Sequence, residues 1–173
     1  MIHALWATFA ELIRTPFQHG EMIWGIVPLY FGLLLSELTS AKANFRTAIQ
    51  TGFSFLWAGA QWLYPYLQFH GANPAGLELK PILPINLVVT GFVLVCGAVA
   101  LTSGLMKRFP RHGRFLGHTR FANYFMITIF PIQAPFQAIH LPWTWERLLA
   151  IVVFAVPVWL VLHYGLMPLR SSR

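Results

Sequence analysis

The stretch Lys107–Arg120 (KRFPRHGRFLGHTR) constrains this chain most strongly, because it separates two long apolar runs. It holds five of the twelve Lys and Arg residues of the chain and no Asp or Glu. Only 10% of all residues are charged. A cluster of charges does not enter the hydrocarbon core of a bilayer, so this stretch must face water on one side of a membrane. It therefore predicts an orientation for the apolar segments on either side.

The hydrophobic content of the chain indicates a membrane protein. Hydrophobic residues make up 57% of its 173 residues and aromatic residues 16%, with a mean hydropathy of +0.60. A soluble domain of this size needs a larger charged fraction to cover its surface. We therefore expect an all-α integral membrane protein with a single membrane domain over residues 1–173.

About five apolar segments are long enough to predict transmembrane helices. Their bounds are residues 22–38, 45–67, 82–106, 119–139 and 147–167. Three of them contain proline well away from their ends or near a second proline, at Pro28, at Pro131 with Pro135, and at Pro157. Because proline removes a backbone donor, we expect a bundle in which several helices are kinked.

The first fifteen residues predict a different kind of helix. Residues 1–15 place apolar side chains on one face at helical spacing, but the segment is too short to span a bilayer. We expect an amphipathic helix in the membrane interface. Pro16 is expected to end it, because proline disfavours helical conformation in the residue before it.

The distribution of basic residues predicts the orientation of the bundle. Nine of the twelve fall on one side of the five predicted spans, in residues 42–46, 107–120 and 170–173, and Arg14, Lys80 and Arg147 fall on the other. Short loops rich in Lys and Arg stay in the cytoplasm. We therefore expect a prokaryotic cytoplasmic (inner) membrane, with the N-terminus outside and the C-terminus inside.

The net charge of +7 has the same explanation. The basic residues lie at the ends of apolar segments, which indicates contact with anionic lipid headgroups and not with nucleic acid. The expected lipid or partner contacts are those of the basic loop, Lys107, Arg108, Arg111, Arg114 and Arg120.

The third predicted span carries a face of small residues. Cys96, Ala100 and Gly104 recur at steps of four, a spacing that lets the backbone of another helix approach closely. We expect a packing face there. Cys96 is the single cysteine of the chain, so a disulfide framework is excluded.

Polar residues inside the predicted spans are the candidates for function. Gln50 and Gln61 lie on the second span among threonine and serine, where they either line a pathway or pack against a neighbouring helix. Gln133 and Gln137 lie beside two prolines, so their amides either satisfy freed carbonyls or help to coordinate a solute. Glu37 is expected to form an interfacial ion pair, with proton coupling as the alternative.

Two histidines raise the question of a cofactor. His163 and His118 are expected at about the same depth in the membrane, where two imidazoles can clamp a haem iron and one can ligate a chlorophyll-type magnesium. In the other interpretation, His163 reaches lipid headgroups and His118 extends the basic loop. The cofactor is unknown, and we expect none.

The sequence favours a protein that is not an enzyme. The chain has five acidic residues, all glutamate, and no motif for hydrolysis or phosphoryl transfer. The leading interpretation is a small non-catalytic subunit or scaffold that packs into a larger membrane complex with other subunits or with itself. The alternatives are an oligomeric transporter or channel for a small solute, and a haem- or pigment-binding electron-transfer subunit.

The predicted topology can be tested by cysteine labelling in intact cells. We expect a cysteine placed near Gly113 to be protected from an impermeant thiol reagent, because the basic loop faces the cytoplasm. A cysteine near Gly76 is expected to be labelled. Labelling of the first position and not the second would reverse the orientation.

Overall fold

The computed structural model is mainly helical in the part of the chain that it describes. It describes residues 2–39, 45–68, 79, 81, 83–107, 120–136, 139 and 141–166, with the side chains of Glu21, Ser36, Glu37, Thr39, Arg120 and Phe121 excepted. Its helices are α1 (Ile2–Gln18), α2 (Gly20–Thr39), α3 (Phe45–Gln68), α4 (Pro84–Met106), α6 (Arg120–Gln133) and α7 (Trp145–Gly165). The all-α fold class is therefore confirmed for these residues.

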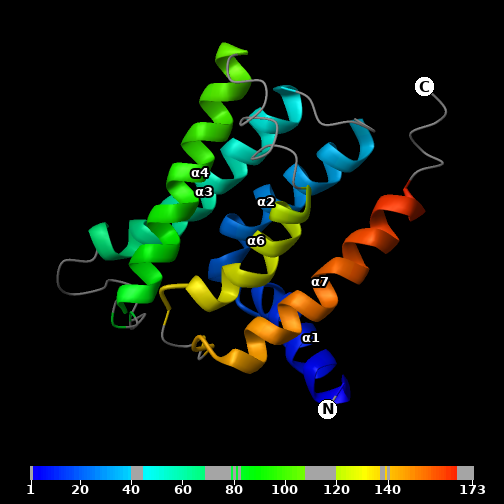
Figure 1. Ribbon diagram of the computed structural model, residues 1–173. Helices are drawn as coiled ribbons and strands as arrows, with labels where there is room; N and C mark the ends of the chain where they lie inside the picture. Colours follow the sequence, from blue (N-terminus) through cyan, green and yellow to red (C-terminus); the bar gives the residue numbers. More distant parts are fainter. Residues whose placement is uncertain are drawn as a thin grey trace.

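Five of the helices alternate in direction. In Figure 1, α2, α4 and α7 end at the upper side of the molecule, and α3 and α6 begin there. The ends near Arg46, Lys107 and Gly165 consequently lie at the same side of the bundle. Helix α1 is separate from this alternation and crosses the lower part of α7 (Figure 1).

Helix α6 lies at the centre of the bundle. It packs against α1, α2, α3 and α7, and its side chains from Asn123 to Gln133 are buried except for the half-buried Phe125. The helix ends at Gln133 and not near Ile139 as the sequence predicts. The reason is Pro135, which disfavours helical conformation at Ala134 and has no N–H to continue the ladder.

Helix α4 is held mainly by α3, and glycine allows the two backbones to touch. A Cβ atom at Gly52 would lie 2.5 Å from the backbone nitrogen of Leu101 and 2.8 Å from the carbonyl oxygen of Gly97. A Cβ atom at Gly97 would lie 3.1 Å from the carbonyl oxygen of Gly52. Side chains larger than hydrogen do not fit at this crossing, so these glycines determine how closely α3 and α4 pack.

Helix α1 continues through Pro16 to Gln18, beyond its predicted end at residue 15. Thr15 and Pro16 are buried, and the Thr15 hydroxyl donates to the Glu11 carbonyl at 2.8 Å. Packing of this last turn outweighs the preference of the residue before proline for an extended conformation. The apolar face of α1 rests on α7, where Phe9 lies 5.5 Å from Phe154 between ring centroids.

Two of the described helices, α4 and α7, are long and apolar enough to cross a membrane. The apolar part of α2, Met22–Leu35, is shorter than the roughly 17 residues that a transmembrane helix needs. The 14 residues of α6 rise about 21 Å, less than the roughly 30 Å of a hydrocarbon core. Association with a membrane is thus supported by two helices, and the bundle of five spans stays a prediction.

The glycine crossing can be tested by adding one methyl group. We expect Gly52→Ala to lower the free energy of unfolding by about 1–3 kcal/mol, because the new Cβ meets backbone atoms of α4 that cannot move aside. The matched control is Gly165→Ala at the end of α7, where nothing lies within 4 Å of an added Cβ. Denaturant unfolding in detergent measures both variants, and equal tolerance would contradict the close crossing.

Candidate functional site

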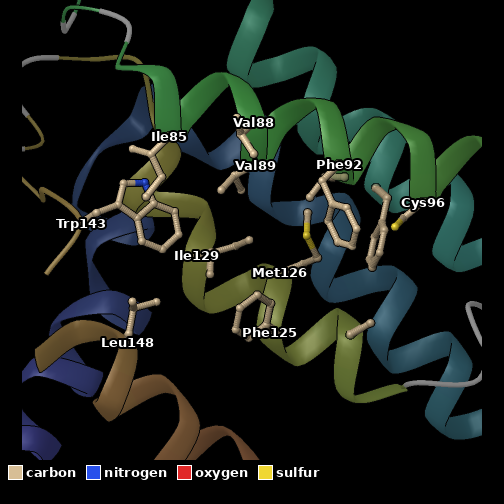
Figure 2. Close-up of a pocket in the computed structure, with 13 residues that line it drawn as sticks. Ile85, Val88, Val89, Phe92, Cys96, Phe125, Met126, Ile129, Trp143 and Leu148 are labelled. Carbon is tan, nitrogen blue, oxygen red and sulfur yellow. The ribbon is translucent and has the colours of Figure 1, made fainter. Parts of the chain in front are cut away.

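An apolar groove of about 560 Å³ separates α4 from α6. Figure 2 shows side chains of α4, among them Val88, Val89 and Phe92, directed toward Phe125 and Ile129 of α6. Ile85, Val88 and Phe92 are also exposed, so the groove opens to the side of the bundle. The groove exists because α4 packs on α3 and not on α6.

The lining of the groove determines what it can hold. Among the described residues, it consists of aliphatic and aromatic side chains with Cys96 and Met126. A volume of 300–1,000 Å³ is typical of ligand sites. The groove therefore fits a hydrocarbon chain.

One end of the groove is closed by the segment before α7. The indole Nε1 of Trp143 donates to Oδ1 of Asn86 at 3.0 Å, which connects this segment to the first turn of α4. The side chain of Arg147, on α7, connects this segment to α1. Its Nη1 donates to the Pro142 carbonyl at 2.7 Å, and its Nη2 lies 3.8 Å from Oε2 of Glu11.

A small cavity lies between α3, α4 and α6. Its volume is about 10 Å³, and its lining includes Trp62, Asn86, Thr90 and Gln133. Trp62 and Gln133 are 2% and 3% exposed. Within the described residues, the Trp62 indole N–H and both amide atoms of Gln133 have no hydrogen-bond partner. Gln133 thus does not satisfy a carbonyl freed by proline, which the sequence had offered as one of two roles.

A second apolar groove, of about 400 Å³, lies between α1, α2, α6 and α7. Each of these helices contributes side chains to its wall, among them Phe9 of α1, Leu33 of α2, Ile127 of α6 and Val158 of α7. Arg14 is exposed and also lines this groove.

The polar residues of α3 face the neighbouring helices. Nδ2 of Asn123, a residue with no exposed surface, donates to the Thr51 hydroxyl at 3.4 Å and joins α6 to α3. Gln50 is half-buried, its carbonyl accepts from the Ser54 hydroxyl at 2.9 Å, and its Oε1 has no partner within the described residues. Gln61 is half-buried as well.

Of the two histidine candidates, His163 lies within the described residues and His118 does not. His163 is half-buried on α7 and contacts its own helical neighbours Trp159 and Tyr164, at 5.8 and 5.4 Å between ring centroids. It lines neither apolar groove. His118 and Gln137 lie outside the described residues, and only the backbone of Glu37 is described, in the last turn of α2.

Cys96, Ala100 and Gly104 are buried on the face of α4 that meets α3. A Cβ at Gly104 would lie 2.9 Å from the carbonyl oxygen of Phe45. Lys107 of the basic loop is exposed, and its left-handed φ of 51° marks the end of α4. Arg120 is the first residue of α6. Arg108, Arg111 and Arg114 lie outside the described residues.

Comparison of the chain with protein-family models, curated proteins and solved structures found no match. The candidate sites are therefore judged on their geometry alone.

Sequence reasoning missed Asn86 and Asn123, whose amides bond Trp143 and Thr51 across the bundle. It also did not single out Trp62, which lines the small cavity. The available signal was an asparagine within an apolar run, since an amide in hydrocarbon needs a partner. The identity of each partner depends on which helices meet.

The hydrogen bond between Trp143 and Asn86 can be tested with adjacent tryptophans. We expect Trp143→Phe to destabilise the protein by about 1 kcal/mol, since it leaves a partly buried amide oxygen unpaired. Trp145→Phe is the control, because Trp145 is 85% exposed. Thermal unfolding of both variants in the same detergent gives the comparison, and an equal effect would show that the bond contributes nothing.

Proposed function

We propose that this chain is a small non-catalytic membrane subunit that packs into a larger membrane complex. The observation that carries the proposal is the outward face of α4. Gly91, Ala98 and Thr102 lie on that face at steps of seven and four residues, and all three are exposed. Association between helices in lipid depends on close backbone approach, which small residues allow.

The hydroxyl on this face also suits an apolar partner. The Thr102 side chain donates to the Ala98 carbonyl at 2.7 Å, so it needs neither water nor a partner side chain. Thr102 then presents its methyl group beside Ala98. A partner helix can rest on this surface without leaving a buried donor unpaired.

The outward face of α7 differs and favours lipid. Between Leu149 and Leu162 its exposed residues are mostly branched and aliphatic, with Val152 and Val161 at 60% and 70% exposure. Such side chains keep another backbone at a distance and pack well against acyl chains. The two apolar helices therefore have separate roles in the proposal: α4 binds a protein partner and α7 contacts lipid.

The direction of the helices supports the proposed orientation in a prokaryotic inner membrane. Arg46 and Lys107 lie at the same end of the bundle as the carboxyl end of α7. Gathering of basic residues at one end is expected for the cytoplasmic side. In the proposal the C-terminus is inside and α1 lies at the outer side.

The proposal can be tested with one tryptophan on each outward face. We expect the wild-type chain, extracted in mild detergent, to migrate on a native gel as part of a larger complex. Ala98→Trp should release it, because a bulky ring prevents a partner helix from approaching α4. Val152→Trp on α7 is the control and should leave the complex intact.

Circular dichroism would verify that both variants keep their helices. A wild-type chain that runs as a monomer, or a complex unaffected by Ala98→Trp, would contradict the proposal. A visible absorption band lost in His163→Ala would favour the cofactor-binding alternative.

A further inference from the structure

We propose that the groove between α1, α2, α6 and α7 binds an acyl chain of an anionic phospholipid, with the lipid phosphate at Arg14. Its volume of about 400 Å³ lies in the range of 300–1,000 Å³ that is typical of ligand sites. Among the described residues, its lining combines mostly apolar side chains with one cation, Arg14. This combination matches a molecule that has an apolar chain and an anionic head.

The groove arises from the way the helices pack. In the described residues, α2 and α7 each pack against α1 and α6, whereas no contact of similar extent joins α2 to α7. Between them α6 contributes the buried side chains of Tyr124 and Ile127 to the lining. Trp6 and Leu162, which also line the groove, are exposed. The groove is therefore open at the surface of the bundle, and a lipid can enter it from the side.

The volume of the groove distinguishes an acyl chain from a partner helix. A helix with its side chains is about 10–12 Å across, so about one turn of it fills this volume. One turn is too little for a helix to dock inside the groove. An acyl chain is thinner and flexible, and the apolar lining suits its methylene groups.

Arg14 provides the charge that selects the head of the ligand. Its side chain is exposed, and its guanidinium has no hydrogen bond or ion pair among the described residues. Glu11, one turn earlier on α1, has its Oε2 3.8 Å from Nη2 of Arg147. The aliphatic part of an arginine packs along apolar surface while its guanidinium stays outside. A guanidinium also binds two oxygens of a phosphate through parallel hydrogen bonds.

The net charge of the headgroup determines which phospholipid fits best. In phosphatidylcholine the trimethylammonium group offsets the phosphate and repels Arg14. Phosphatidylglycerol keeps its negative charge and has no cation of its own. Because Arg14 is exposed, the opening of the groove has room for a whole headgroup, and a fatty-acid carboxylate would leave it partly unfilled.

A charge substitution tests the headgroup contact. The full chain in mild detergent is titrated with phosphatidylglycerol or phosphatidylcholine, and bound lipid is counted by native mass spectrometry. We expect one tightly bound phosphatidylglycerol per chain. Arg14→Gln should weaken its binding about fivefold, the factor that corresponds to one basic residue near an anionic lipid. Arg46→Gln is the matched control, because Arg46 is exposed on α3 and does not line the groove.

A steric substitution on α1 tests the position of the acyl chain. Ala10 lines the groove, so the ring of Ala10→Phe should occupy the space and displace the lipid. Ala7→Phe is the control, because Ala7 is exposed on the same helix and does not line the groove. Circular dichroism of both variants verifies that the helices are kept.

Several results would overturn the proposal. Equal binding of phosphatidylcholine would exclude selection by charge, and equal weakening in Arg46→Gln would indicate a net-charge effect. A folded Ala10→Phe that retains the lipid would place the acyl chain elsewhere. A fatty acid that displaces phosphatidylglycerol at equal concentration would show that the site takes a free carboxylate. No described residue of α4 lines this groove, so none of these results depends on the partner proposed for α4.

Discussion

Burial of α6 is the constraint on which the rest of the structure depends. A helix covered by α1, α2, α3 and α7 must satisfy its backbone internally or through those neighbours. The middle of α6 does so through the backbone hydrogen bonds of the helix itself. Beyond its carboxyl end lies Pro135, which has no backbone N–H to donate. The buried polar side chains of α6 are Asn123 close to its start, Thr128 in its middle and Gln133 at its last residue.

The second constraint is the contact between α3 and α4. Backbone contact at Gly52 and Gly97 commits one face of α4 to α3, and α4 is therefore not available to cover α6. The apolar groove between α4 and α6 is the consequence, as is the exposed outer face of α4. A single close crossing thus produces both the groove for a hydrocarbon chain and the surface that we propose binds a partner.

Much of the helical framework was predictable from the sequence, since the apolar runs that became α2, α3, α4 and α7 are bounded by polar residues or proline. The ends of α1 and α6 were not, because tertiary packing carries α1 through Pro16, while Pro135 ends α6 early. Composition also does not state which apolar segments span a bilayer and which are covered by other helices. The bond between Thr51 and Asn123 and the cavity beside Gln133 depend on contacts between segments far apart in the chain.

The kind of polar group inside the bundle bears on what the protein does. The buried polar side chains of the described residues are threonine, serine, asparagine and glutamine, all of which are neutral. None of them changes charge near neutral pH, so none can carry a proton as histidine or a carboxylate does. Neutral hydrogen-bonding groups in an apolar interior instead define which helices meet and in which register, because each one requires a specific partner. These residues fit the role that we propose in a larger complex, because a bundle of one defined shape would present a fixed outer face of α4 to a partner.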